Sequence, residues 1–588
     1  MKQFFKFLFA SCLGVFLAMG VLFLVGSWMA TRAVSSASAA KPVKPNTILH
    51  LTFDKAVPEK TNNTQRAMTS LKEEDIVGLH DMVAAIGEAK SDNNIKGIYI
   101  DAMSIQMGMA TATVLRDALL DFKESGKFII AHSKYYTQGA YYMASTADKV
   151  YVHPMGSIDF RGFSSEKAFF KDMIDKLGIK MQIFWAGQFK SASEPYRLNK
   201  MSEPSRLQVR EYLEGIYQVF LTKLAASRNV SVSELRNIAD NYLVRNAKDA
   251  VKYKLADQIA YKDEVLVDLR NRIGLGENDK IKTISISKYY KGHLPKQDFA
   301  VKDKIAIVYA EGIINLGKGT NGTIGDDKYT KIIRKLRKKD DIKAIVLRVN
   351  SGGGSALASE NIWRELELAK EEGKVVVTSM GDVAASGGYY ISCNSQKIFA
   401  EPNTITGSIG VVGAIPSLEK MMGEHAGIHF DTVKTGRFTS GISPFLDMSD
   451  EELRILQAGT EDVYQTFLSR VAAGRKMSVE DVHKIAQGRV WIGSKAKELG
   501  LVDEMGGLDD ALAAAASLAG LEKYRTTEYP RIKEPLQQFI EDYLGGNKDP
   551  SMAIQKELGE FYPYYKYLKE IKENKGIQAI IPYTFEFK

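Results

Sequence analysis

Cysteine is almost absent from the 588-residue chain, which contains only Cys12 and Cys393. Two cysteines so far apart exclude a disulfide framework and a thiolate metal site within one chain. The eight histidines are scattered and show no HExxH or similar metal-binding spacing. We therefore expect neither a metal nor another cofactor.

Charge of one sign is not concentrated anywhere in the chain. The 79 basic and 71 acidic residues leave a net charge of +8 without a long basic run, which indicates a solvated surface and not a nucleic-acid-binding one. Apolar residues make up 45% and charged residues 26% of the chain, the ordinary mix of a folded globular protein. Because single cores stop growing near roughly 250–300 residues, the length predicts two domains.

Long apolar runs are missing except at the N-terminus. Residues 7–30 carry no charge and lie between Lys6 and Arg32, which is long enough for a transmembrane helix. A cleaved signal peptide is the alternative, since small residues follow at 36–40, but its apolar region is usually about 7–15 residues long. We expect residues 1–32 to be a retained single-pass anchor, followed by a linker at 33–45.

The positive-inside rule then orients the chain. Lys2 and Lys6 stay in the cytoplasm, so the large remainder lies across the membrane. In a bacterium with two membranes, this places the protein in the inner membrane with its folded domains on the periplasmic side.

An internal duplication follows the linker. The run NIKGIYI at 94–100 recurs as DIKAIVL at 341–347, and the segments that follow each run repeat in the same order. The offset is 247 residues between Ile95 and Ile342 and 248 between Tyr141 and Tyr389. Short β-branched runs alternate with helical periodicity, the pattern of buried parallel strands and covering helices. We predict two tandem α/β domains at 46–290 and 303–528, a connector at 291–302 and a helical, Tyr-rich extension at 529–588.

Two glycine-rich turns occur in the second half but not in the first. They are Arg348-Val-Asn-Ser-Gly-Gly-Gly-Ser355 and Gly381-Asp-Val-Ala-Ala-Ser-Gly-Gly-Tyr389, each placed where a strand gives way to a helix. Such junctions present backbone N–H groups to a developing anion. Ser386 is therefore a candidate nucleophile, and the N–H groups of Gly354 and Gly387 are candidates for an oxyanion hole. Asp382 is more typical of a turn or helix cap than of a catalytic acid.

These turns, together with Thr404-Ile-Thr-Gly-Ser-Ile-Gly410, resemble the signal peptide peptidase A family, also called protease IV, peptidase family S49 of the ClpP/crotonase-like superfamily. The resemblance covers nearly the whole chain. It implies two crotonase-like domains, Ser386 as nucleophile, and Lys190 in Gly187-Gln-Phe-Lys-Ser-Ala-Ser-Glu-Pro195 as general base. It also implies a homotetramer that degrades hydrophobic signal-peptide remnants released into the membrane.

The duplication supports the same division of the site. When one half is laid on the other, Gln138 falls against Ser386 and Thr439 falls against Lys190. Each half thus keeps the residue that the other lacks, which predicts one active site per chain. Lysine acts as a base only when neutral, and we expect Phe184, Trp185 and Phe189 to exclude water around Lys190.

Three alternatives remain open from the sequence. A Ser-His-Asp triad would draw on His425, His429 or His483, none of which lies in a motif typical of a triad. An acyl-thioester hydratase or isomerase would use the same paired glycines but needs a carboxylate where Ser386 stands. An inactive peptide-binding scaffold would be favoured if Lys190 pointed to bulk solvent.

Overall fold

The computed structural model describes residues 3, 4, 6, 7, 14, 20, 43–64, 76–293, 298–532 and 578–580, the last three by their backbone alone. Most of the expected anchor, the linker except for residues 43–45, part of the connector and most of the C-terminal extension lie outside these residues. No helix within the described part of the chain has the length and apolarity needed to cross a membrane.

The N-terminal half is built on a six-stranded parallel sheet with the strand order β6-β4-β3-β2-β1-β7. Its elements are β1 (Thr47–Leu51), α2 (Leu79–Ser91), β2 (Ile95–Ile100), α3 (Met109–Lys123), β3 (Phe128–Ser133), α4 (Gln138–Ala144), β4 (Lys149–Val152), α5 (Lys171–Lys176), β5 (Lys180–Ala186), η1 (Ser191–Ser193), α6 (Glu194–Arg197), α7 (Glu203–Arg228), α8 (Val232–Asp240), α9 (Ala247–Lys252), β6 (Gln258–Ile259), α10 (Lys262–Arg272), β7 (Lys282–Ser285) and α11 (Ile286–Gly292).

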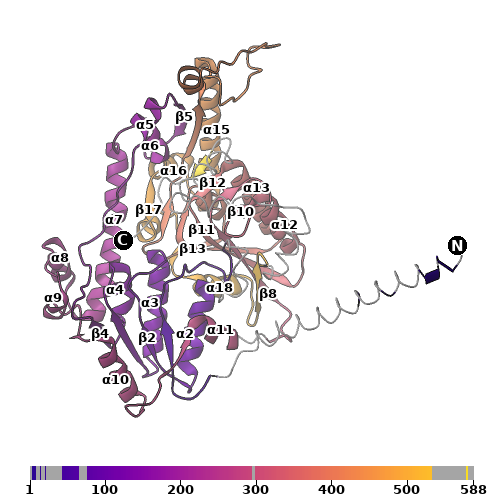
Figure 1. The fold of residues 1–588 in the computed structure, drawn as a ribbon. Helices are drawn as coiled ribbons and strands as arrows, with labels where there is room; N and C mark the ends of the chain where they lie inside the picture. The colour runs from indigo at the N-terminus through magenta and orange to yellow at the C-terminus, as the bar shows by residue number, and fades with distance from the viewer. Residues whose placement is uncertain are drawn as a thin grey trace.

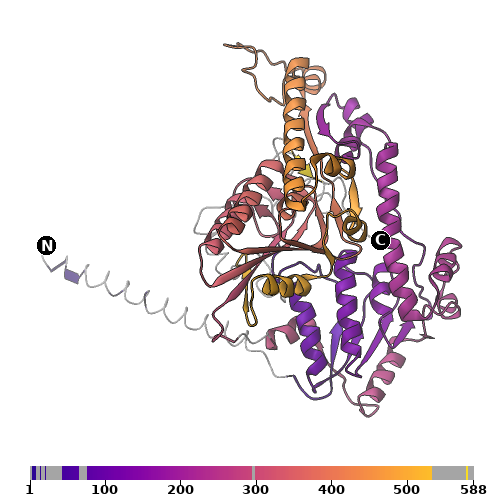
Figure 2. The same cartoon turned by 180° about the vertical axis from the view of Figure 1, so that it is seen from behind.

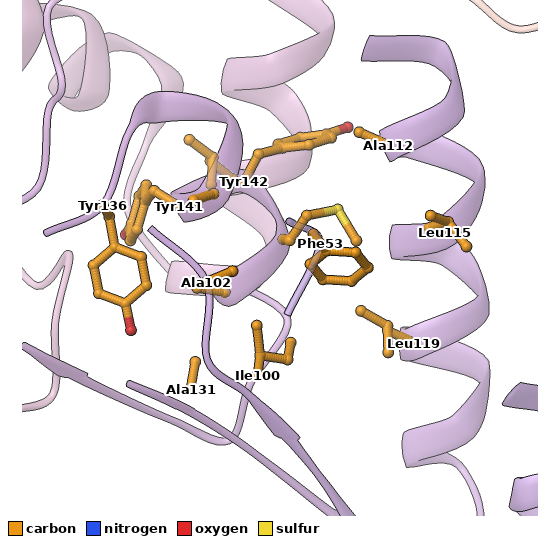
Figure 3. Close-up of a cluster of buried hydrophobic side chains, with 14 of the residues drawn as sticks. Phe53, Ile100, Ala102, Ala112, Leu115, Leu119, Ala131, Tyr136, Tyr141 and Tyr142 are labelled. Atoms are coloured by element: carbon orange, nitrogen blue, oxygen red, sulfur yellow. The ribbon is translucent and has the colours of Figure 1, made fainter. Parts of the chain in front are cut away.

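Successive residues of the central strands face opposite layers of helices. In β2, Ile100 belongs to the large core that includes α2 and α3, whereas Tyr99 belongs to a smaller core with Leu269 of α10. In Figure 3, Leu119 projects from α3 toward Phe53 and Ile100 in the large core. A sheet covered on both faces explains why its strands are almost continuously apolar in the sequence.

The C-terminal half is built on an eight-stranded sheet with the path β17-β15-β13-β11-β8-β19, and β14 pairs with β13 and β18. Only the β15–β17 pairing is antiparallel among the pairs of this sheet that the structure describes. Its elements are β8 (Lys304–Glu311), β9 (Ile314–Asn315), β10 (Ile324–Gly325), α12 (Asp326–Arg337), β11 (Ile342–Ser351), β12 (Gly353–Ser355), α13 (Ala356–Glu371), β13 (Val375–Ala385), α14 (Gly387–Ser392), β14 (Lys397–Ala400), β15 (Ile405–Gly407), β16 (Val411–Ser417), η2 (Met421–His425), α15 (Asp450–Arg475), α16 (Val479–Ile485), β17 (Val490–Ile492), α17 (Gly493–Glu498), β18 (Glu504–Met505), α18 (Leu508–Leu518), β19 (Arg525–Tyr529) and β20 (Gln578–Ile580).

The two halves repeat one another, as the sequence predicts. The order β2-α3-β3-α4-β4 recurs as β11-α13-β13-α14-β14. The long helices α7 and α15 are each 26 residues, and each begins after a serine, Ser202 or Ser449, whose side chain accepts a backbone N–H. Each ends at a left-handed residue, Asn229 or Lys476, again 247 positions apart. The predicted tandem α/β architecture is confirmed.

The halves also share a sheet, which the sequence did not predict. The second six-stranded sheet has the order β10-β9-β12-β20-β16-β5, and β5 is its only strand from the N-terminal half among the described residues. It pairs antiparallel with β16 from Ala186–Val411 to Lys180–Ser417. Figures 1 and 2 show β5, α5 and α6 beside α15, at the end of α7 that is distant from the sheet of the N-terminal half.

A short strand from the C-terminal extension completes this sheet. Residues 578–580 form β20, which pairs antiparallel with Gly353–Ser355 of β12 and with Val412 of β16. The prediction of a helical extension is therefore wrong for these three residues. They pair their main chain with two sheet strands, and backbone pairing of this kind does not depend on helical periodicity in the sequence.

Candidate active site

Ser386 lies between β13 and α14, where the chain leaves a central strand of the eight-stranded sheet. Its backbone angles are φ 56° and ψ −119°, and a non-glycine residue held in such a region costs about 1–3 kcal/mol. Its N–H donates to Gly407 O at 2.8 Å, and its carbonyl accepts from Tyr390 N at 2.8 Å. The strained turn thus holds a buried serine hydroxyl at a rigid strand-to-helix junction.

Lys190 approaches Ser386 from the other half of the chain, in the turn just after β5. Its Nζ lies within hydrogen-bond distance of Ser386 Oγ at 2.8 Å, of Ser408 O at 3.0 Å and of Ser408 Oγ at 3.1 Å. The residue is 1% exposed, and this burial lowers the pKa of Lys190 well below its ordinary value. The structure therefore brings the two predicted residues into direct contact, with the amine in surroundings that favour its neutral form.

Both halves hold the turn that carries Lys190. Phe189 N donates to Gln487 O at 2.8 Å. From α7, Gln208 Nε2 donates to Phe189 O at 2.9 Å, while Gln208 Oε1 accepts from Val490 N at 3.1 Å. A buried glutamine therefore ties the lysine turn to β17 of the second half.

Sequence reasoning did not single out Ser408, Gln208 or Gln487. Ser408 lies in the Thr404–Gly410 motif that carries the family resemblance, so a signal for it was present. Gln208 and Gln487 lie in stretches with no such motif. Their side-chain type and spacing are common on solvated helices and loops, and the sequence contains no pattern that distinguishes them.

The expected aromatic wall around Lys190 is partly wrong. Phe184 is buried, and the Phe189 ring lies under the Arg489 guanidinium at 4.7 Å. Trp185, however, is 38% exposed and its ring stacks under Arg197 at 4.4 Å. Successive residues of a strand point to opposite faces, so Phe184 and Trp185 of β5 cannot both face the interior.

The two glycine turns lie against each other beside this pair. Gly354 has φ 154°, and a Cβ built on it would lie 2.1 Å from Ile314 O of β9. A Cβ on Gly388, in the first turn of α14, would lie 2.5 Å from Ser351 O. Only glycine permits such close backbone approach. The oxyanion-hole role of the Gly354 and Gly387 N–H groups stays a prediction.

Gln138 and Thr439, the positions that the duplication pairs with Ser386 and Lys190, form hydrogen bonds to nearby backbone groups. Gln138 begins α4, and its Oε1 accepts from Arg161 N at 3.1 Å and Gly162 N at 2.9 Å. Thr439 is exposed and donates to Gly436 O at 2.9 Å. Neither residue contacts a counterpart that would form a second serine–lysine pair in the described contacts.

The histidines considered for a triad lie elsewhere. His425 and His429 are exposed, and His483 Nδ1 is 3.0 Å from Tyr464 OH. The hydrogen-bond partner of the Ser386 hydroxyl is the Lys190 amine. The geometry therefore favours lysine over histidine as the group that could take a proton from Ser386.

Comparison with known proteins agrees with this architecture. The family described as "Peptidase family S49" matches residues 121–275 and 368–522, and the family "Clp protease" matches residues 296–406. "Protease 4" of Salmonella typhi is 37% identical over 476 residues, covering 79% of this chain and 76% of the relative. "Protease 4" of Haemophilus influenzae is 35% identical over 531 residues, covering 85% and 84%. "Serine protease SPPA, chloroplastic" of Arabidopsis thaliana is 30% identical over 502 residues, covering 84% and 72%.

The duplicated family match and these relatives define the chain as a serine protease. More particularly, it belongs to peptidase family S49, with one match to the family in each half of the chain. The resemblance drawn from the sequence motifs is confirmed.

The buried amine predicts a pH-dependent stability. Between the lowered pKa of folded Lys190 and the ordinary value of 10.5, unfolding takes up a proton, so raising the pH through this window stabilises the fold. The slope approaches about 1.4 kcal/mol per pH unit for one group. Below the pKa of folded Lys190, the cost of burying this amine reduces the free energy of unfolding by its full, constant amount. Above pH 10.5 this cost vanishes.

Replacing Lys190 by Met removes this proton uptake. Urea unfolding at several pH values should show that the free energy of unfolding of wild type, relative to Lys190→Met, rises from neutral pH toward pH 10. An unchanged difference across that range would mean that the amine is not held neutral in the fold.

Proposed function

We propose that the chain is a serine endopeptidase with a Ser386/Lys190 dyad. Neutral Lys190 Nζ removes the proton from Ser386 Oγ as that oxygen attacks the peptide carbonyl carbon. The N–H groups of Gly354 and Gly387 stabilise the oxyanion. The protonated amine then gives its proton to the leaving amine, and water hydrolyses the acyl-enzyme with Lys190 again as base.

One observation carries this proposal: the buried Nζ–Oγ contact of 2.8 Å between the two halves. A base must be within hydrogen-bond reach of the proton it removes, at about 2.6–3.2 Å. The desolvated surroundings supply the neutral amine that the step requires. The condition that would favour an inactive scaffold, Lys190 pointing to solvent, is not met at 1% exposure. The acyl-thioester alternative is also disfavoured, because such an enzyme needs a carboxylate at the position that Ser386 occupies.

The proposed substrates are cleaved signal peptides and other short hydrophobic peptides. The pairing of β20 with β12 supports an extended substrate, because an extended segment already lies antiparallel to Gly353–Ser355 there. Main-chain pairing tolerates many side chains, which suits the degradation of varied peptide remnants.

The dyad predicts the loss of activity in two single variants. Ser386→Ala should lower the turnover of a quenched hydrophobic peptide at least about 10³-fold because the nucleophile is gone. Lys190→Ala should lower it by roughly 10²–10⁴ because general-base catalysis is gone. Exposed Ser469→Ala and Lys484→Ala are the matched controls.

The outcomes separate the alternatives. If only Ser386→Ala is inactive and Lys190→Ala turns over normally, the base lies elsewhere and His483 is the next residue to test. If both variants retain activity while folded, the dyad is wrong.

We also propose that residues 7–30 anchor the chain in the inner membrane, with both domains on the periplasmic side. The uncharged run between Lys6 and Arg32 supports this orientation. The full chain should stay with membranes after an alkaline carbonate wash, and protease added to spheroplasts should digest it. Release by carbonate, protection in spheroplasts, or an intact mass lacking the first residues would contradict a retained anchor.

A homotetramer is proposed for the assembled protein. The support is the resemblance to the long form of the family together with the ClpP-like fold. Sedimentation velocity of the detergent-solubilised full chain should give a protein mass four times the 65.3 kDa of one chain. A protein mass of one chain at micromolar concentration would overturn this proposal.

A further inference from the structure

A glutamate of the N-terminal half lies buried inside the C-terminal half. Glu59 is 3% exposed and follows β1 in a stretch that leaves its own sheet. Arg348 of β11 donates to its carboxylate from Nε at 2.8 Å and from Nη2 at 3.3 Å. Arg348 is itself 2% exposed, so a complete ion pair is desolvated between the halves.

The pair lies where β11 and β13 part. Their parallel pairing joins Val349 to Met380 and resumes with Ser351 and Ala384. Residues 381–383 of β13 therefore stand opposite a single residue of β11. The backbone ladder is interrupted at this bulge, so side chains must hold the strands together there.

Asn350 and Glu59 supply that connection. Asn350, the single residue opposite the bulge, accepts from Val383 N through Oδ1 at 3.1 Å. Its Nδ2 donates to Glu59 Oε1 at 3.0 Å. A Cβ on Gly381 would lie 2.4 Å from Glu59 Oε1, so the bulge has room for this carboxylate only because glycine stands there.

Arg348 links the same carboxylate to β13. Its Nη1 donates to Ser379 Oγ at 2.7 Å and to Met380 O at 2.9 Å. Through Arg348 and Asn350, the Glu59 carboxylate is thus connected to β13 just before the bulge, at Ser379 and Met380, and at the last residue of the bulge, Val383. Its own position is fixed in turn, because Glu59 N donates to Glu311 Oε1 at 2.9 Å and Asn63 Nδ2 donates to Glu311 Oε2 at 2.8 Å.

Both strands lead directly into the active site. After Ser351, β11 continues into the turn that contains Gly354, and β13 ends at Ala385, immediately before Ser386. Any change in the separation of the strands at the bulge alters the separation of the turn from the serine. A displacement of about 1 Å by a remote change can lower a rate about 10²-fold.

We propose that Glu59 is a positioning residue for catalysis: supplied by the half that carries Lys190, it sets the spacing between the Gly354 turn and Ser386. The inference rests on the proposed Ser386 nucleophile and adds a residue that touches neither the substrate nor the reacting atoms. The N-terminal half then contributes the base and also fixes the position of Ser386 relative to the Gly354 turn.

The test compares two buried glutamates of the full-length chain that each pair with arginine. Glu59→Gln removes the carboxylate at the bulge. Glu365→Gln is the control, since Glu365 on α13 is 5% exposed and accepts from Arg334 Nε at 3.0 Å without contact to β13 among the described hydrogen bonds. Peptide turnover gives kcat and KM, thermal unfolding gives stability, and a fluorophosphonate, which loses fluoride to the serine hydroxyl, reports the rate of Ser386 phosphonylation.

We expect Glu59→Gln to lower kcat and the fluorophosphonate rate about 10-fold to 10²-fold, with KM changed less than about threefold because ground-state binding is retained. Glu365→Gln should leave kcat within about threefold at a similar loss of stability. Equal losses of kcat in the two variants, or a normal kcat in Glu59→Gln, would overturn the positioning role.

A double variant separates positioning from the cost of an unpaired charge. Glu59→Leu with Arg348→Met removes both buried charges and should restore thermal stability, and it carries the test if Glu59→Gln does not fold. Its kcat should stay low because the contact of residue 59 to Asn350 and the contacts of residue 348 to Ser379 and Met380 are missing, whereas a restored kcat would overturn the proposal. Ser386→Ala is run in parallel. Full activity of Ser386→Ala would overturn both the dyad and the positioning role of Glu59. If Ser386→Ala is inactive while Glu59→Gln is fully active, only the positioning role is overturned.

Discussion

A primary amine buried against a hydroxyl is the interaction on which much of this structure depends. Burial lowers the pKa of Lys190 and so disfavours its charged form, and this effect requires that water be kept from the amine. No single half encloses it. The turn after β5, Gln208 of α7 and the Gln487 carbonyl each supply part of the enclosure. The pairing of β5 with β16 follows from the same constraint, since it brings the lysine turn into the second half.

Docking of the halves depends on directional polar contacts as well as on apolar packing. Asp382, in the β13 bulge, accepts from Thr111 N at 2.9 Å and from Thr111 Oγ1 at 2.6 Å, and so caps the first turn of α3 from the other half. Asn403 Nδ2 donates to Thr113 Oγ1 at 3.1 Å. Burial raises the pKa of Asp382. Losing a partner from such a buried group costs about 1–3 kcal/mol, so these contacts penalise any sliding of one half on the other.

The features that the sequence could predict are those with a period or a local motif. The repeated βα order and the placement of Ser386 at a strand-to-helix junction follow from such patterns, whereas Lys190 of the first half is implied by the family resemblance. The partner of β5 does not, because alternation along a strand indicates which residues are buried but not which strand lies beside it. The local sequence indicates a turn or a cap for Asp382, but the helix that it caps is α3, more than 250 residues earlier in the chain. Glu59 lies in an aperiodic stretch, where a buried carboxylate looks like an exposed one.

Duplication also leaves positions that no longer need the original side chain, and the two halves use them differently. Gln138 is 4% exposed and holds the backbone of residues 161–162, so it has become part of the packing of its own half. Thr439 lies in an exposed segment, and its described hydrogen bonds are both local, to Gly436 O. The interface between the halves is asymmetric because the two halves have diverged since the duplication. The N-terminal half reaches into the C-terminal half with Glu59, which lies at the bulge of β13, and with Lys190, which contacts Ser386 directly after β13. Restoring a serine at position 138 alone could not create a second site, because Thr439 stands in the matching position and supplies no amine.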